Sequence, residues 1–168
     1  MTRSPRVVLV GPPGAGKTSV GALLASRWGV TLVDTDQVIE TEQATTVSDI
    51  FVDQGEAVFR GLEEAAVADA LTTHDGVLAV GGGAILSDAT RARLDGQRVV
   101  FLDVGLAASA GRVGLGLTRP LLLGNVRGQL KTLLDARRPL YTQVASAVVA
   151  TDALSVAEVA DEVERLLA

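Results

Sequence analysis

Short apolar runs alternate with segments of helical periodicity along the chain. Nearly every residue in these runs is hydrophobic, which is typical of strands that are covered on both faces. We expect strands at residues 7–10, 31–33, 77–80, 99–102 and 147–150. Between them, the spacing of apolar residues predicts helices over residues 18–28, 56–71 and 126–137 and from residue 155 onward. This alternation predicts parallel strands joined by crossovers, and therefore a three-layer α/β domain.

Local signals mark the ends of these helices. Gly29 suits the position just after the first helix, and Pro139 predicts that the third helix stops just before it. Ser155 and Glu158 have the spacing of a capping box at the start of the last helix. Two segments, residues 35–61 and 114–125, fit the alternation poorly. The length of 168 residues suits one domain, which we place at residues 1–168.

Composition narrows the classes of protein. The chain is 48% hydrophobic, which is enough for a sizeable core and excludes a disordered chain. With 15 basic and 20 acidic residues, the chain has a net charge of −5. A general nucleic-acid-binding protein would normally be positively charged. Cysteine is absent and there is one histidine, so disulfides, thiolate sites and His-rich metal sites are excluded. No apolar run is long enough for an export signal or a membrane span, and we expect a cytoplasmic protein.

A phosphate-binding motif follows the first strand. Residues 11–18 read GPPGAGKT and match G-x-x-x-x-G-K-[ST], with a strand before and a helix after. The glycines let successive backbone N–H groups point at one anion, and the helix N-terminus adds its partial positive charge. Lys17 supplies a cation for the β- and γ-phosphates, and the Thr18 hydroxyl is placed to bind Mg²⁺. This motif predicts nucleotide binding.

Carboxylates at strand ends are candidates for the metal and for a second substrate. Asp34 and Asp36 follow the strand at residues 31–33, and residues two apart on an extended chain share one face. One carboxylate could therefore serve the metal and the other a hydroxyl group, although a helix-capping turn explains the same pair. Asp103 follows the fourth strand and also fits a metal-binding pattern, but we favour a helix cap or turn there.

Three glycines follow the third strand, at Gly81, Gly82 and Gly83. At the carboxyl end of a parallel strand, glycines allow the backbone to approach a ligand closely. A loose turn is the alternative interpretation.

Arginines are candidates for binding an anionic substrate, because guanidinium pairs with carboxylate and phosphate. Arg119 stands in a glycine-flanked loop that could close over phosphates. Arg60 could equally form a surface pair with a nearby glutamate, Glu56, Glu63 or Glu64. Arg137 and Arg138 could instead be charges at the C-terminus of a helix. We expect Trp28 and Tyr141 to be packing residues, and His74 to lie in a loop.

Taken together, these motifs resemble the shikimate kinase family. The resemblance covers residues 11–18, 34–36, 59–60, 81–84, 118–122 and 137–141. It implies a five-stranded parallel sheet of strand order 2-3-1-4-5 and of the P-loop NTP hydrolase type. It also implies a substrate-binding segment at about residues 35–61 and a lid at about residues 114–125.

The resemblance implies roles for single residues. ATP would be bound by residues of the first loop and helix and by two arginines: Gly14, Ala15, Gly16, Lys17, Thr18, Ser19, Arg112 and Arg119. Shikimate would be bound by Asp36, Arg60, Gly81, Gly82, Gly83 and Arg137. Thr18 and Asp34 would hold one Mg²⁺ ion that arrives with ATP. Lys17, Asp36 and Arg119 would be catalytic: Asp36 orients or deprotonates the attacking hydroxyl, and Arg119 neutralises charge on the transferring phosphoryl group.

The implied reaction is transfer of the γ-phosphoryl group of ATP to the 3-hydroxyl of shikimate, in aromatic amino-acid biosynthesis. ATP and shikimate are the expected partners of a monomer, with no nucleic acid and no membrane. Two features depart from the family: residues 151–154 carry no basic side chain, and the lid segment is more apolar than usual. Another small-molecule kinase, such as a gluconate or nucleoside monophosphate kinase, and a non-catalytic nucleotide sensor remain alternatives.

Overall fold

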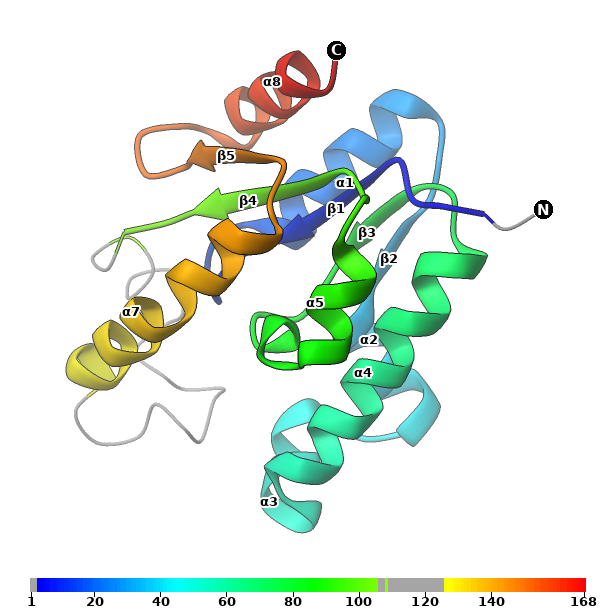
Figure 1. Cartoon of the computed structure of the whole chain (residues 1–168), viewed down its shortest axis with the longest axis vertical. Helices are drawn as coiled ribbons and strands as arrows, with labels where there is room; N and C mark the ends of the chain where they lie inside the picture. The colour runs from blue at the N-terminus through cyan, green and yellow to red at the C-terminus, as the bar shows by residue number, and fades with distance from the viewer. Residues whose placement is uncertain (1–2, 106–107, 109–125) are drawn as a thin grey trace.

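A five-stranded parallel sheet organises the chain. A computed structural model describes residues 3–105, 108 and 126–168 (Figure 1). The strands are β1 (Val7–Val10), β2 (Leu32–Asp34), β3 (Val77–Ala79), β4 (Val99–Asp103) and β5 (Ala147–Ala150). They pair in the order β2-β3-β1-β4-β5, and each pair is parallel. The strand order and the parallel sheet implied by the resemblance are therefore confirmed.

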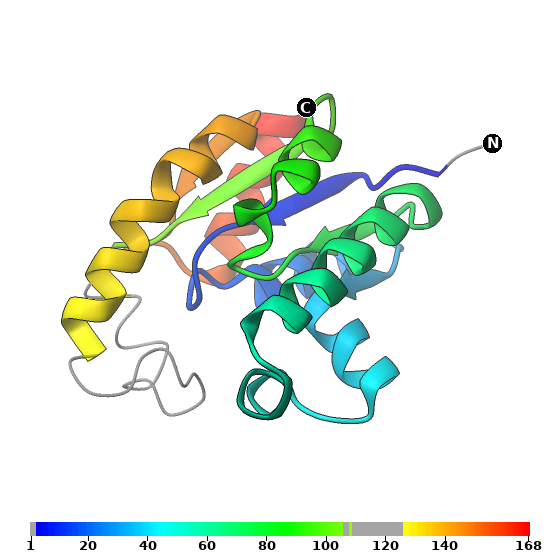
Figure 2. The ribbon, with the colours of Figure 1, turned by 60° about the horizontal axis from the view of Figure 1, so that its bottom comes forward.

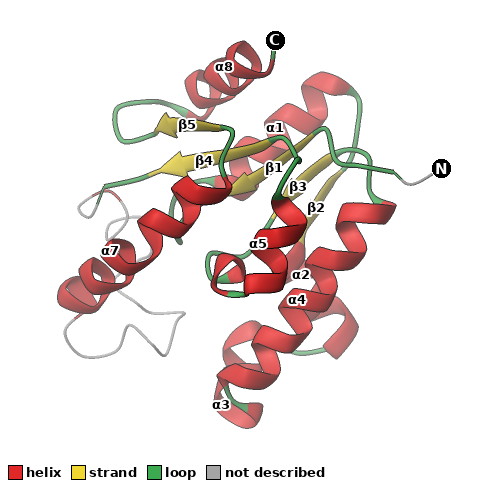
Figure 3. Ribbon diagram, viewed as in Figure 1, coloured by secondary structure: helices red, strands yellow, loops and turns green. Residues whose placement is uncertain are grey.

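Helices cover both faces of the sheet, with the strands between them (Figure 3). Helices α1 (Lys17–Trp28) and α8 (Val156–Leu167) pack on one face. The other face carries α4 (Glu56–Thr73), α5 (Asp88–Leu94) and α7 (Val126–Val144), together with the 3₁₀ turn η1 (Ala84–Leu86). This arrangement confirms the three layers.

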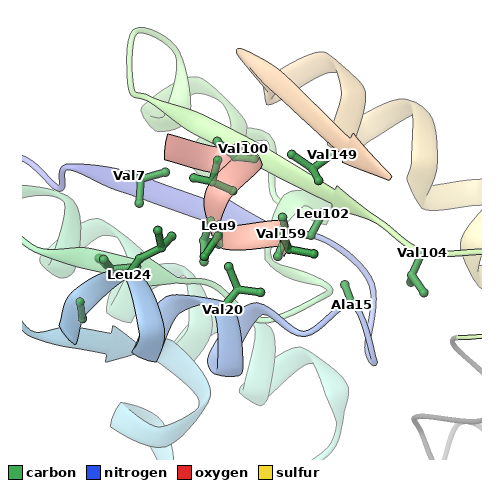
Figure 4. Close-up of a cluster of buried hydrophobic side chains, with 14 residues drawn as sticks. Val7, Leu9, Ala15, Val20, Leu24, Val100, Leu102, Val104, Val149 and Val159 are labelled. Carbon is green, nitrogen blue, oxygen red and sulfur yellow. The ribbon is translucent and has the colours of Figure 1, made fainter. Parts of the chain in front are cut away.

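The central strand β1 shows why the apolar runs lack polar positions. Val7 and Leu9 point into the core cluster under α1 and α8 (Figure 4), whereas Val8 and Val10 belong to the cluster on the opposite face. Each of the four side chains is at most 1% exposed. Alternate residues of a strand point to opposite faces, so a strand with helices on both sides must be apolar throughout. The edge strand β5 departs from this pattern, since Val148 is 48% exposed.

The parallel register brings the loops that carry the motifs to one edge of the sheet. Leu9 of β1 and Asp34 of β2 both pair with Ala79 of β3. The phosphate-binding loop, the Asp34 turn and the three glycines therefore leave the sheet side by side, at its carboxyl edge. Ligands of open α/β sheets bind at this edge.

The segment at residues 35–61 folds as a helical insertion. It contains α2 (Thr35–Gln43), α3 (Val47–Gln54) and the start of α4, which lie together beyond the edge of the sheet (Figure 2). Ile39, Ile50 and Phe59 are at most 1% exposed and form a small core of their own. The alternating pattern fails here because these helices pack on one another rather than on the sheet.

The predicted end of the helix before Pro139 is wrong. Helix α7 continues to Val144 with Pro139 inside it, although proline cannot donate a backbone hydrogen bond and normally ends or kinks a helix. Beyond Pro139, Leu140 and Val144 pack against the sheet cluster, and Tyr141 is buried within it. This packing outweighs the lost hydrogen bond.

Two further helical pieces, η1 and α5, lie between residues 84 and 94, where the hydrophobic pattern predicts none. Ser87 opens α5 by accepting a hydrogen bond from the Thr90 amide. At the other end of the chain, the predicted capping box of Ser155 and Glu158 is confirmed at the start of α8. Within the described residues, no helix combines the length and apolar character needed to cross a membrane.

Candidate active site

The phosphate-binding loop joins β1 to α1. Gly14 and Gly16 have φ angles of 81° and 88°, in the left-handed region that favours glycine. Gly16 is the N-cap of α1, and it offers no side chain to the first amides of the helix. At the start of the loop, a Cβ on Gly11 would lie 2.6 Å from the carbonyl oxygen of Leu102. The loop therefore curls tightly into a helix N-terminus suited to an anion.

Lys17 is folded across this loop. Its Nζ donates hydrogen bonds to the carbonyl oxygens of Gly11 (2.7 Å) and Pro12 (3.0 Å). These contacts hold a positive charge against the backbone of the loop. Ala15 is buried, whereas the side chains of Thr18 and Ser19 are exposed at the start of α1.

Asp34 connects the loop to the end of β2. Its Oδ2 accepts a hydrogen bond of 2.7 Å from the Thr18 hydroxyl. Its Oδ1 accepts from the backbone N–H groups of Asp36 and Gln37, which makes Asp34 the N-cap of α2. The capping interpretation and the proximity to Thr18 therefore both apply. Two hard oxygen donors lie together here, a chemistry that suits Mg²⁺.

The three glycines each leave room for a different part of the site. A Cβ on Gly81 would lie 2.6 Å from carboxylate oxygens of Asp36 and of Glu63. A Cβ on Gly82 would lie 3.0 Å from Cδ of Pro13, in the phosphate-binding loop.

Gly83 faces Arg60, because a Cβ there would lie 2.5 Å from Cζ of the guanidinium. None of the three glycines has a positive φ, so space rather than backbone conformation requires them. Side chains of the protein pack closely against this turn, so it is not loose, and the close approach of a ligand to it stays a prediction. The Gly81 amide is further held by the hydroxyl of buried Thr35, at 3.1 Å.

Arg60 reaches the turn from α4. It donates hydrogen bonds to Glu63 at 2.8 Å and to Glu56 at 3.4 Å, so the expected glutamate pairing is present. The guanidinium carbon also lies 5.7 Å from the ring centre of Phe51 and 5.3 Å from that of Phe59, within cation–π range. The pairing thus holds Arg60 at the glycine turn rather than on an open surface.

Sequence reasoning assigned no site role to Glu63. The side chain is 2% exposed, and burial raises its pKa from the ordinary value, an effect that the Arg60 charge opposes and the Asp36 charge reinforces. A buried carboxylate is costly unless it is paired. The sequence signal for a role of Glu63 was its spacing of three residues from Arg60. Many exposed ion pairs have the same spacing, so this signal does not single out Glu63.

Arg137 joins the cluster from α7. It is 8% exposed, and burial lowers the pKa of its guanidinium from the usual value. The charges of two neighbours also act on this pKa: Arg60 lowers it further and Glu63 raises it. Because α7 continues to Val144, Arg137 is not a charge at a helix C-terminus.

Arg138 points elsewhere and pairs with Asp103 at the end of β4, with 3.2 Å between Nη2 and Oδ1. Asp103 is the last residue of β4, and its candidate role in metal binding stays a prediction. His74 is 9% exposed, and its Nε2 lies 2.9 Å from the carbonyl oxygen of Val77.

Arg112, Arg119 and the expected lid at residues 114–125 lie outside the described residues.

Comparison with known proteins identifies the family. The family model described as shikimate kinase matches residues 13–168. A shikimate kinase of Thermobifida fusca is 53% identical, over 99% of this chain and 97% of that protein. One from Streptomyces avermitilis is 56% identical, over 95% of this chain and 93% of that protein.

Solved structures agree. A shikimate kinase from Acinetobacter baumannii, in complex with shikimate, superposes with a TM-score of 0.93 at 34% identity, over 99% of this chain and 93% of that one. A gluconokinase from Sinorhizobium meliloti 1021 is only 21% identical with a TM-score of 0.57, over 99% of this chain and 91% of that one, and it shares the fold alone. The chain therefore belongs to the shikimate kinase family.

Proposed function

We propose that this site transfers the γ-phosphoryl group of ATP to the 3-hydroxyl of shikimate. The observation that carries the proposal is the meeting of Asp36 and Arg60 at a glycine turn that also approaches Pro13 of the phosphate-binding loop. The buried charge of Arg137 acts on the Arg60–Glu63 pair at the same turn. An acceptor bound there would meet the end of a nucleotide without a large movement of either. The Acinetobacter baumannii relative, solved with shikimate, supports this acceptor.

Arg60 and Arg137 would bind the carboxylate of shikimate. They come from α4 and α7, both are largely buried, and each influences the pKa of Glu63. Two guanidinium groups that converge from different helices suit a small carboxylate, because guanidinium and carboxylate form directional paired hydrogen bonds. Neutral sugars and nucleobases offer no such anion.

Asp36 would orient the attacking hydroxyl. Its carboxylate lies against Gly81, on the same turn as the groups that would hold the acid. Phosphoryl transfer passes through a loose transition state, so alignment and charge stabilisation contribute most of the catalysis. Asp36 accepts the proton that the hydroxyl loses as the new bond to phosphorus forms.

Lys17, the loop amides and the helix N-terminus would bind the β- and γ-phosphates, with Gly14, Ala15, Gly16, Thr18 and Ser19 supplying the rest of the loop. The Thr18 hydroxyl and the Asp34 carboxylate fit a single Mg²⁺ ion. When bound, the ion neutralises phosphate charge. No group of three potential metal-binding side chains occurs in the described part of the chain, so phosphate and water would complete the coordination.

The family resemblance adds Arg119 at the γ-phosphate, Arg112 at the adenine, and a lid at about residues 114–125. Residues 35–61 would form the substrate-binding segment of a single kinase domain. All the groups named come from one chain, so a monomer suffices. Placement in the cytoplasm and the absence of nucleic-acid and membrane partners belong to the same proposal.

A coupled assay of ADP release tests the acceptor. Shikimate, gluconate and a nucleoside monophosphate are each supplied with ATP and Mg²⁺. We expect turnover with shikimate to exceed that with the other two by at least about a hundredfold. The ring of shikimate fixes its hydroxyls relative to its carboxylate, whereas gluconate is an open chain and a nucleoside monophosphate has no carboxylate. Comparable turnover with gluconate would contradict the acceptor assignment, and ATP binding without turnover would indicate a nucleotide sensor.

A further inference from the structure

We infer that the hydroxyl group of Tyr141 is a positioning group for the acceptor site, acting through the Gly82 peptide and Arg137. This inference rests on the proposed function, because it concerns the same site. The position of Tyr141 in the sequence predicts only a packing residue, and the ring does pack, with its centre 5.0 Å from that of Phe101. The hydroxyl needs a separate explanation.

The hydroxyl donates a hydrogen bond to the carbonyl oxygen of Gly82, at 2.5 Å. Tyr141 is 1% exposed, so no surface water competes for this contact. Burial raises the pKa of Tyr141 to about 12, against the opposing effect of the Arg137 charge and hydrogen bond. The phenol therefore stays protonated, and remains a donor, at neutral pH.

Holding the Gly82 carbonyl fixes a whole peptide plane. The carbonyl of Gly82 and the amide of Gly83 belong to the same rigid unit. Gly83 faces the Arg60 guanidinium, and Gly82 faces Pro13 of the phosphate-binding loop. A rotation of this peptide would move the backbone against both neighbours. Glycine resists such rotation least of all residues, so an external anchor has most effect here.

Tyr141 also neighbours Arg137. Tyr141 and Arg137 are four residues apart on α7, a spacing that places both on one face of the helix. Each side chain acts on the pKa of the other. The residue that holds the glycine turn thus lies one helical turn from one of the two arginines that would bind the substrate carboxylate.

Phenylalanine would fill the same space. The ring of Tyr141 lies in an apolar cluster with Val80, Ile85 and Phe101, where packing requires no oxygen. A buried hydroxyl costs free energy unless it is hydrogen-bonded. Its presence is explained by its hydrogen bond to the Gly82 carbonyl, in a side chain that neighbours Arg137 on α7.

Tyr141→Phe tests the inference, with Ser146→Ala as a matched control. The Ser146 hydroxyl also bonds to backbone, at the Val99 amide (2.9 Å), but at the amino end of β4. Each variant therefore loses one hydroxyl that is bonded to the main chain. Steady-state kinetics and thermal unfolding are measured for both variants and for the wild type.

We expect Tyr141→Phe to raise KM for shikimate about tenfold and to leave KM for ATP within about twofold of the wild type. Ser146→Ala should lower the Tm and change neither constant. If Tyr141→Phe lowers the Tm but leaves KM for shikimate unchanged, its role is structural and the inference is wrong. Lack of wild-type turnover with shikimate would instead contradict the proposed function.

A second measurement does not depend on the variant folding. Tyr141 is the one tyrosine of the chain, so 3-fluorotyrosine labels this site alone. We expect saturating shikimate to shift the ¹⁹F resonance of the labelled protein, and an equal concentration of gluconate to leave it in place. A resonance that shikimate leaves unmoved would overturn the inference.

Discussion

Gly81, Gly82 and Gly83 act through the side chains that they lack. Each has an ordinary backbone conformation, yet an added methyl group would meet a carboxylate, a proline of the phosphate-binding loop or a guanidinium. Their role is therefore to let two charged side chains and the phosphate-binding loop approach the backbone closely. A single methyl group at this turn should change binding much more than stability.

Gly83→Ala tests whether a methyl group at the glycine turn impairs the binding of shikimate. The new Cβ would displace the guanidinium of Arg60, which is the mobile end of a long side chain. We expect KM for shikimate to rise at least about tenfold, with a Tm change of no more than about 2 °C. Gly61→Ala, next to Arg60 on α4 but with no atom within 4 Å of its added Cβ, is the control. Equal KM values for the two variants would refute the steric role of Gly83.

Glu63→Gln tests the buried carboxylate through pH. Burial raises the pKa of Glu63 above its ordinary value of 4.5, so the folded protein binds this proton more tightly than the unfolded chain does. The stability that protonation contributes is complete below pH 4.5 and is lost as the pH rises through the folded-state pKa. Glutamine does not titrate.

The free energy of unfolding of Glu63→Gln relative to the wild type should therefore rise between about pH 4 and about pH 7. Urea unfolding of both proteins at the two pH values measures this difference. A difference that stays constant, or that falls with rising pH, would show that burial does not dominate the titration of Glu63.

At the scale of elements, hydrophobic periodicity located all five strands, α1, α4 and α8 to within a few residues, because the strands form the sheet and each of these helices packs on one of its faces. It failed for α7 beyond Pro139, where the packing of Tyr141 and Val144 overrides a local helix-breaking signal. It also missed α2 and α3, which bury their apolar side chains against α4 instead of the sheet. Short helices of this kind have weak periodicity of their own.

Gly61→Ala also makes a prediction about α4 itself. Gly61 lies inside the helix, and an added Cβ there would meet no atom within 4 Å. Alanine restricts the unfolded chain and favours the helix, so we expect the free energy of unfolding to rise by about 0.5–1 kcal/mol. Chemical denaturation measures the change. A loss of stability would mean that the site cannot accept a methyl group.

Ser155→Ala separates stability from catalysis. The Ser155 hydroxyl accepts from the Glu158 amide at 3.1 Å, and α8 packs on the face of the sheet opposite α4 and α7. Loss of this cap should cost about 1 kcal/mol of stability. Turnover at a temperature well below the Tm should be unchanged. Reduced turnover of the fully folded variant would reveal an unexpected link between α8 and the site.

At the scale of the molecule, the site joins segments from opposite ends of the chain. Motifs with a fixed spacing, such as residues 11–18, could be found in the sequence because their chemistry is local. The roles of Glu63 and Tyr141 could not be found in the sequence, because they depend on contacts across the fold. Tyr141, for example, bonds to Gly82, which is 59 residues away. The sequence therefore predicted which residues could bind anions. The fold shows which other residues hold those anion-binding residues in place.

Asp36→Asn tests whether nucleotide binding and transfer to the acceptor depend on separate parts of the site. Nucleotide affinity depends on the phosphate-binding loop, so we expect the Kd for ATP to stay within about twofold of the wild type. Turnover should fall at least about a hundredfold, because asparagine cannot accept the proton of the hydroxyl. Isothermal titration and the ADP-release assay measure the two quantities. Near-normal turnover would place the base elsewhere.

The most direct test is a crystal structure with ADP and shikimate bound together. We expect the shikimate carboxylate between Arg60 and Arg137, with a ring hydroxyl within hydrogen-bond distance of Asp36 and facing the diphosphate beside Lys17. Shikimate bound away from the two arginines, or with its hydroxyls turned away from Lys17, would overturn the proposed function.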